Sequence, residues 1–213
     1  KPHEILTFGQ IIEQSRNIGI IKVASRGGEK SLHNYSQEYG FGSSTNIGLG
    51  GESSGTLRKL SDWSPVSVAE VSMGHEVGIS ALQLAMAYSA IANDGILLRP
   101  YIVNNIENSS GKFVYSNRSQ AVRKIANQDV MDILTELLVN AVEKGTGTEA
   151  FIPGWQVAGK TGTAQKYING DYSNTKFVSN FVGFLPASNP QLLCAIILDE
   201  PRIGYHWGGK GAA

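Results

Sequence analysis

The hydrophobic period changes late in the chain, and this change restricts the possible folds more than any other feature. Apolar residues recur at helical spacing in three segments, 8–24, 81–93 and 127–145. Three later runs have the length and composition of strands: 156–167, 177–185 and 192–198. The links between these runs are short, which favours antiparallel pairing. The sequence therefore predicts an α+β fold, an antiparallel sheet flanked by helices.

Capping residues and one polar interruption mark the predicted helices. Ser80, with Gln83 three residues later, forms a capping box that predicts the start of a helix. Asn127 is a candidate N-cap for the helix that follows it. The polar group 14–17 interrupts the first helical segment, which predicts helix, short break, helix. Side chains at that break are candidates to face a cleft.

Turn residues divide the middle of the chain. Strands are predicted at 96–106 and 112–115, joined as a hairpin by the turn-forming residues 108–111. Segment 40–57 is rich in Gly, Ser and Thr, and it is predicted to be a surface loop.

The composition is that of one globular domain. The chain has 213 residues, 41% of them hydrophobic and 17% charged, which suffices for a hydrophobic core. Lys plus Arg equals Asp plus Glu at 18 each, so there is no net charge to attract nucleic acid or anionic lipid. The single cysteine, Cys194, lies in an apolar run and is predicted to be buried.

Both ends of the chain are expected to be cut from a larger domain. Lys1–Glu4 does not begin a signal peptide, and no stretch approaches the ~18 apolar residues of a membrane span. Any export signal or anchor is therefore expected upstream of Lys1. Residues 208–213 contain no capped or amphipathic element, so a closing C-terminal helix is expected to be missing as well.

A phosphate-loop pattern, G-x-x-x-x-G-K-[ST], occupies residues 154–161, and Asp199 ends an apolar run as a magnesium-binding acid does. Phosphate binding requires a buried strand before the loop and a helix immediately after it. Pro153 precedes the pattern, and the β-branched and Gly residues at 161–164 start helices badly. The sequence therefore predicts that Lys160 lies within a strand, and nucleotide binding is the disfavoured alternative.

In a strand, the Lys-Thr-Gly-Thr string at 160–163 resembles the K-T-G motif of penicillin-binding proteins and serine β-lactamases. Further stretches are similar to class B penicillin-binding proteins, the monofunctional peptidoglycan cross-linking enzymes: 41–52, 78–85, 145–147, 157–165 and 181–187. They follow the family order and cover most of the chain. The resemblance implies the penicillin-binding, β-lactamase-like fold, with residues 1–213 as a partial transpeptidase domain.

The second family motif, S-x-N, has two string matches. Ser15 and Asn17 lie at the break between two helices, where the family has this motif. Ser44 and Asn46 lie in the Gly-rich loop that the family shows further on. Position favours Ser15 and Asn17, with helix capping as the structural alternative.

The third motif, S-x-x-K, requires Ser at a helix start and Lys one turn later on the same face. The string occurs at Ser109–Lys112, in a predicted hairpin turn, and at Ser173–Lys176, in a predicted link between strands. Neither position suits the motif, and both follow Ser15, which the nucleophile should precede. The nucleophilic serine is therefore expected upstream of Lys1, and the chain alone is expected to be inactive.

The resemblance implies serine acyl transfer by a D,D-transpeptidase that cross-links peptidoglycan stem peptides. The catalytic residues it implies are Ser15, Asn17, Lys160 and Thr163, and the substrate-binding residues are Thr161, Gly162 and Thr163. Lys160 and the two Thr hydroxyls would bind the terminal carboxylate, and Gly162 would let the substrate backbone approach. The N–H of Thr163 would be one oxyanion donor. Ser15 would relay a proton to the leaving amine, and Asn17 would hold the substrate amide.

The implied partners are stem peptides ending in D-Ala-D-Ala, β-lactam antibiotics and, through the parent protein, other cell-wall synthesis proteins, but no nucleic acid. The implied location is the outer face of the bacterial cytoplasmic membrane. No cofactor or metal is expected, since His75 and His206 lack metal-ligand spacing. Alternatives of the same fold are a carboxypeptidase, a β-lactamase or an antibiotic sensor, and another class is a non-catalytic module.

Overall fold

The computed structural model describes residues 5–202 and 206–213, so the residues Lys1–Glu4 considered above lie outside the described part. In chain order the elements are α1 (Phe8–Glu13), α2 (Asn17–Gly27), α3 (Glu29–Glu38), β1 (Thr56–Leu57), a 3₁₀ turn (Leu60–Asp62), α4 (Ser67–Ser72), β2 (Val77–Gly78), α5 (Ala81–Ala92), β3 (Ile96–Leu98), β4 (Asn105–Glu107), β5 (Phe113–Ser116), β6 (Ala121–Lys124), α6 (Gln128–Glu143), a second 3₁₀ turn (Thr148–Ala150), β7 (Ala158–Ile168), β8 (Asp171–Leu185), β9 (Leu192–Asp199) and α7 (Gly208–Gly211). The predicted α+β class is confirmed. None of these helices is long and apolar enough to cross a membrane.

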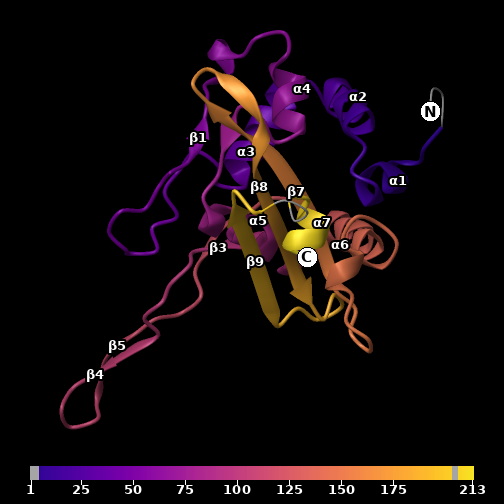
Figure 1. Cartoon of the computed structure of the whole chain (residues 1–213). Coiled ribbons are helices and arrows are strands. Elements are labelled where there is room, and N and C mark those ends of the chain that lie inside the picture. Colours follow the sequence, from indigo (N-terminus) through magenta and orange to yellow (C-terminus); the bar gives the residue numbers. More distant parts are fainter. Residues whose placement is uncertain (1–4, 203–205) are drawn as a thin grey trace.

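The predicted meander of three strands is confirmed as an antiparallel sheet of order β7-β8-β9 (Figure 1). Lys160 pairs with Val182 and Thr161 with Phe181, so these neighbours project from opposite faces of the sheet. Helices α5 and α6 pack against one face, and α7 lies over β7 and β8. The two outer strands therefore contact different helices: β7 contacts α6 and α7, and β9 contacts α5.

One of two core clusters lies between the sheet and helices α5 and α6, and the other joins Phe181 of β8 to Ala212 at the end of α7. Phe184 and Ala158, paired across β8 and β7, are completely buried against Leu138 and Val139 of α6. Tyr88 and further residues of α5 close the same cluster. Close packing of this kind fixes the position of β7 relative to the helices, and β7 carries the Lys-Thr-Gly-Thr string.

Helices α1 to α4 form a second group beside the free edge of β7 (Figure 1). The predicted helix–break–helix at the start of the chain is confirmed as α1 and α2. Helices α3 and α4 were not predicted. Helix α3 is mostly polar, with His33 its one buried residue, so it has few apolar residues from which a helix could be recognised. Helix α4 has only six residues, too few to show a helical period.

The predicted capping box is confirmed at the start of α5, where Ser80 and Gln83 exchange hydrogen bonds. The Gln83 amide also donates to the carbonyl oxygens of Ser43 at 2.9 Å and Ser54 at 2.8 Å. Because Gln83 is buried, these bonds tie both ends of the predicted Gly-rich loop to α5. The loop is confirmed, apart from its last two residues in β1.

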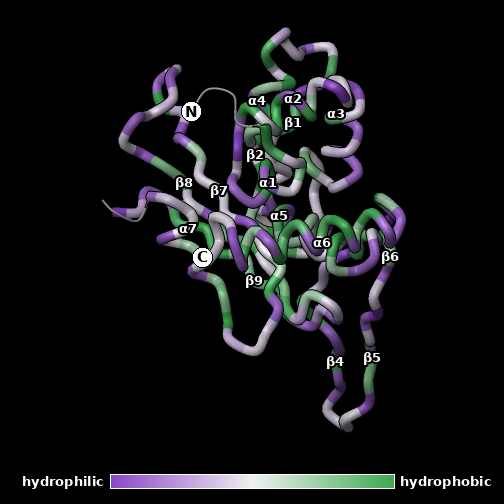
Figure 2. Tube along the Cα trace, turned by 90° about the vertical axis from the view of Figure 1, so that its right-hand side faces the viewer, coloured by the Kyte–Doolittle hydropathy of each residue, from purple (hydrophilic) through white to green (hydrophobic). Residues whose placement is uncertain are grey.

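A long arm projects from the body of the molecule, with β4 and β5 at its end (Figures 1 and 2). The hairpin around residues 108–111 is confirmed, but the single strand predicted at 96–106 is wrong. That run divides into β3 and β4 near Pro100, which has no N–H for a strand ladder. Strand β3 instead pairs with β6, which was not predicted.

Two smaller predictions are wrong. Cys194 is exposed, because it pairs with Gly183 and lies on the part of the sheet that α7 does not reach. Ser173–Lys176 lies within β8 rather than in a link between strands. Asn127 stands at the N-cap position of α6, as predicted, although its side chain makes no capping bond. Residues 208–211 form the four-residue helix α7, and the expected lack of a longer closing helix stays a prediction.

Candidate active site

The break between α1 and α2 brings Ser15 to the edge of a cavity. Ser15 has φ of 50°, a left-handed conformation that turns the chain sharply between the two helices. Helix α2 begins at Asn17, and Arg16 takes the N-cap position without a side-chain capping bond. Helix capping, the structural alternative for Ser15 and Asn17, therefore receives no support from the geometry. Both side chains line the cavity.

Lys160 connects the sheet to this break. Its ammonium donates a short hydrogen bond to the Ser15 hydroxyl. It also donates to the Thr161 carbonyl oxygen at 3.0 Å and to the Thr146 hydroxyl at 3.3 Å. None of the ion pairs among residues 5–202 and 206–213 includes Lys160. The ammonium is thus held by neutral oxygens, and its charge is available to an anionic ligand.

Burial also changes the acidity of Lys160. Desolvation of the charged form lowers the pKa of the Lys160 ammonium to about 8. A carboxylate placed beside the ammonium would favour the charged form and raise this pKa again. The group therefore suits recognition of an anion near neutral pH, and its neutral form is accessible for proton transfer.

Thr146 connects the end of α1 to strand β7. It was not assigned to the site from the sequence. Its hydroxyl lies 2.8 Å from the Thr161 hydroxyl, and its backbone N–H donates to the Glu13 carbonyl oxygen at 3.0 Å. Gly145 permits this contact, since a Cβ there would lie 2.2 Å from the same Glu13 oxygen. The signal was the Gly-Thr-Gly string at 145–147, which was noted as part of the family resemblance but given no role.

The backbone of β7 presents Thr163 to the free edge of the sheet. The Thr161 carbonyl accepts from Lys160, so it points away from β8. Residues two apart in an antiparallel ladder point the same way, which directs the Thr163 N–H to the same edge. This orientation is compatible with the oxyanion donor that the family resemblance implies.

Two side-chain roles expected in this strand differ in the structure. The Thr163 hydroxyl accepts from the Gly208 N–H at 2.9 Å, so it fastens α7 instead of facing the cavity. A Cβ at position 162 would lie 2.6 Å from the end of the Asn180 side chain, which would have to move to accommodate it. The close neighbour of Gly162 in this structure is therefore Asn180.

The cavity beside Ser15 and Lys160 has a volume of about 660 Å³. Apolar side chains from α1, α2, α4, β2 and α5 form most of its wall, among them Ile11, Ile20, Val71, Val77 and Tyr88. Burial raises the pKa of the Tyr88 hydroxyl, so this ring remains neutral. Polar groups lie at one end of the cavity, an arrangement typical of ligand sites.

The other S-x-N match lies elsewhere. The Ser44 hydroxyl is 3.0 Å from the Ser54 hydroxyl within the Gly-rich loop, and Ser44 lines a different pocket. The structure thus brings Ser15 and Asn17, rather than Ser44 and Asn46, to Lys160.

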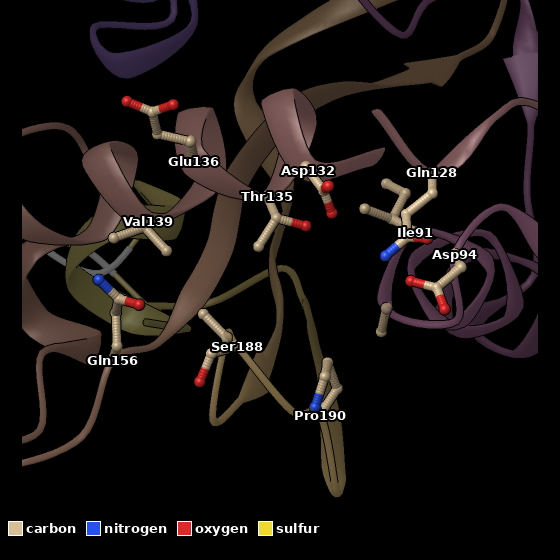
Figure 3. Close-up of a pocket in the computed structure, with 12 residues that line it drawn as sticks. Ile91, Asp94, Gln128, Asp132, Thr135, Glu136, Val139, Gln156, Ser188 and Pro190 are labelled. Carbon is tan, nitrogen blue, oxygen red and sulfur yellow. The ribbon is translucent and has the colours of Figure 1, made fainter. Parts of the chain in front are cut away.

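Another pocket, of about 300 Å³, lies between α5, α6 and the loop before β9 (Figure 3). Three carboxylates line it, Asp94, Asp132 and Glu136, and all three are exposed. None of the residues assigned to catalysis or substrate binding contributes to this pocket, so it is separate from the Lys160 cavity.

The residues around Lys160 do not have the structure that a phosphate loop requires. Lys160 lies inside β7, as predicted, and the chain continues as a strand to Ile168. The strand continues directly after Lys160, so no helix starts there to direct its N-terminus at a phosphate.

The fold and the site define a penicillin-binding transpeptidase domain, and comparison with known proteins agrees. The family described as penicillin binding protein transpeptidase domain matches residues 1–213. This chain belongs to that family, and within it to the class B proteins.

Relatives of known name are similar over nearly the whole chain. The probable peptidoglycan D,D-transpeptidase PenA of Neisseria gonorrhoeae is 35% identical over 93% of this chain and 32% of its own length. Stage V sporulation protein D of Bacillus subtilis is 34% identical over 99% of this chain and 33% of its own length. The chain therefore spans about a third of these relatives.

Solved structures agree with the fold. Penicillin binding protein 3 of Mycobacterium tuberculosis, in complex with aztreonam, has a TM-score of 0.87 at 29% identity over 92% of this chain and 45% of that one. The transpeptidase domain of Burkholderia pseudomallei penicillin-binding protein 3 has a TM-score of 0.84 at 32% identity, covering 96% of this chain and 60% of that one.

Proposed function

We propose that this chain is part of a serine D,D-transpeptidase domain that cross-links peptidoglycan stem peptides and binds β-lactams. The observation that carries the proposal is the hydrogen bond between Lys160 and Ser15 at the polar end of the cavity. It joins the K-T-G strand to the S-x-N break, the two family motifs present in this chain. PenA, which is named as a probable peptidoglycan D,D-transpeptidase, supports the reaction type.

In the proposed reaction a serine attacks the amide after the penultimate D-alanine, releases the terminal D-alanine, and passes the acyl group to an amine. The Lys160 ammonium attracts the terminal carboxylate, and the Thr161 hydroxyl lies beside it at 3.4 Å. The Thr163 N–H, at the free edge of β7, stabilises the oxyanion. Ser15 and Lys160 form a path for a proton to the leaving amine, and Asn17 positions the substrate amide.

The nucleophile is proposed to come from a segment of the parent protein that precedes Lys1 and carries S-x-x-K at a helix start. The apolar wall of the cavity suits the packing of such a helix beside Ser15 and Lys160. A β-lactam would enter the same site, since a relative is known in complex with aztreonam.

The proposed setting is the bacterial envelope, on the outer face of the cytoplasmic membrane, with the anchor in an upstream segment. PenA is named as a probable peptidoglycan D,D-transpeptidase, and peptidoglycan is part of the bacterial envelope, which supports this setting. Other cell-wall synthesis proteins are proposed as partners of the parent protein. The chain spans only about a third of its relatives, so these partners are proposed for the parent rather than for this chain.

Fluorescent penicillin tests the proposal on the chain and on its complete parent domain. The parent should form a covalent adduct that survives denaturation and maps to a serine upstream of Lys1. The chain alone should form none, because its own serines have no lysine one helical turn away. A parent domain without an S-x-x-K serine and without an adduct would indicate a non-catalytic module.

A further inference from the structure

Among the residues that the structure describes, none pairs as a third strand with the far end of the β7–β8 hairpin. Strand β9 pairs with β8 from Val178 to Leu185, so the ribbon formed by residues 165–177 continues as two strands only. An isolated two-stranded ribbon is marginally stable in water. Lys166 and Lys176 pair with Glu200 at 2.9 and 3.2 Å at the base of the ribbon, but these exposed pairs contribute little.

A ring stack fastens the tip of this ribbon to the helical layer. The Tyr172 ring lies on the His75 ring with centroids 4.6 Å apart and an angle of 23° between the planes. Tyr167, the cross-strand partner of Tyr172, contacts the Tyr172 ring edge-on at 5.2 Å. The ribbon and α4 are adjacent in Figure 1. Tyr172 and His75 are both partly buried, which removes them from competing water contacts.

The His75 side of the stack is rigid. Its Nδ1 lies 2.9 Å from a Glu70 carboxylate oxygen, and its backbone N–H donates to the Glu70 carbonyl oxygen at 2.9 Å. The next residue, Glu76, pairs with Arg58, whose guanidinium also donates to Ser67 at 2.9 Å. The turn after α4 therefore offers a fixed platform to the tip of a ribbon whose other described contacts lie at its base.

This contact lies at the end of the active-site cavity. Met73 and Gly74, which immediately precede His75, line the cavity together with Lys160 and Thr161. Tyr172 belongs to the ribbon that continues β7 beyond these site residues. The stack therefore ties the substrate-binding strand to the opposite wall of the cavity.

We propose that His75 is a positioning residue that latches the β7–β8 ribbon and so holds the free edge of β7 in place for acyl transfer. The inference rests on the proposed function. Loss of the stack would release the ribbon and reduce the population in which the Thr161–Thr163 edge is aligned. Aromatic pairs are worth enough to change such a population by about two- to tenfold.

The test measures the second-order rate of acylation by fluorescent penicillin, together with the melting temperature, in the complete parent protein. Tyr172→Ala and His75→Ala should each lower the rate by about two- to tenfold without changing the melting temperature. The double variant should be no slower than the slower single variant, because both remove one contact. Tyr172→Phe, which keeps the ring for stacking, should retain most of the rate.

Acylation at the wild-type rate in both alanine variants would overturn the latch. Multiplied losses in the double variant would overturn it as well, since the two side chains would then act separately. A Tyr172→Phe variant as slow as Tyr172→Ala would also overturn it, because the ring and its stacking are retained. If His75→Ala does not fold, Tyr172→Ala decides alone. If the wild-type parent does not react with fluorescent penicillin, the proposed function itself is wrong. If the wild type reacts and the variants react at the same rate, only the latch is wrong.

Discussion

The hydrogen bond from Lys160 to Ser15 joins residues 145 positions apart in the chain. Ser15 is placed by the sharp break between α1 and α2, and Lys160 by the packing of β7 against α5 and α6. The bond from the Thr146 N–H to the Glu13 carbonyl oxygen ties these two parts together close by. The geometry of the site therefore depends on how the helical group and the sheet meet.

Ser15→Ala and Asn17→Ala should separate catalysis from stability. In the complete domain each change should slow penicillin acylation, by about 10²–10⁴-fold for Ser15 if it transfers a proton. The melting temperature should not change, because neither side chain caps α2. Acylation rates and thermal unfolding of both variants provide the measurement.

The opposite pattern would identify structural residues. A loss of about 1 kcal/mol in the free energy of unfolding with unchanged acylation is what removal of a helix cap produces. Ser44→Ala is the matched control, since Ser44 belongs to the other S-x-N match and lies in a different pocket. It should leave the acylation rate unchanged.

The lowered pKa of Lys160 predicts a pH dependence of stability. In the folded state this pKa is about 8, whereas an unfolded lysine has a pKa of about 10.4. Between these values the unfolded chain binds more protons, so the Lys160 contribution to the free energy of unfolding rises with pH. Urea unfolding of this chain at pH 7.5 and at about pH 9.5 should therefore show a larger gain for wild type than for Lys160→Gln.

An equal change with pH in wild type and Lys160→Gln would contradict this prediction. It would mean that water reaches the ammonium in the folded state, so that burial does not lower its pKa. Lys112→Gln, in the turn of the exposed arm, is the matched control and should behave as wild type.

Gly162→Ala should lower stability because of the Asn180 side chain. A Cβ at position 162 would lie 2.6 Å from the Asn180 Oδ1. Because the end of the Asn180 side chain can move, the loss should be near the low end of the about 1–3 kcal/mol that overpacking costs. The free energy of unfolding of Gly162→Ala, measured alone and together with Asn180→Ala, checks the cause. The second change should recover most of the loss, and an equal loss in both backgrounds would exclude Asn180 as the reason.

Local patterns predicted much of the fold. The capping box at Ser80 and Gln83 and the strand runs after Gly145 depend on neighbouring residues, so the sequence shows them directly. The exposure of Cys194 depends on which strands α7 covers, and α7 was not expected. An apolar run indicates a strand, but it does not say which of its faces another element will cover.

The site was predicted by family resemblance rather than by spacing. Nothing in the hydrophobic period places Ser15 beside Lys160, because long-range contacts follow from packing. Thr146 was missed because one threonine between two glycines resembles a turn. The hydroxyl of Thr163 was assigned to the substrate, whereas α7 engages it through Gly208.

The acylation rate of Lys160→Ala in the complete domain tests the central claim most directly. If Lys160 positions the substrate carboxylate and holds Ser15, the second-order rate with fluorescent penicillin should fall by about 10²–10³-fold, as when one group that stabilises developing charge is removed. The melting temperature should hardly change, since burial already disfavours the ammonium. Acylation within a small factor of wild type would contradict the assignment of the K-T-G strand to the active site.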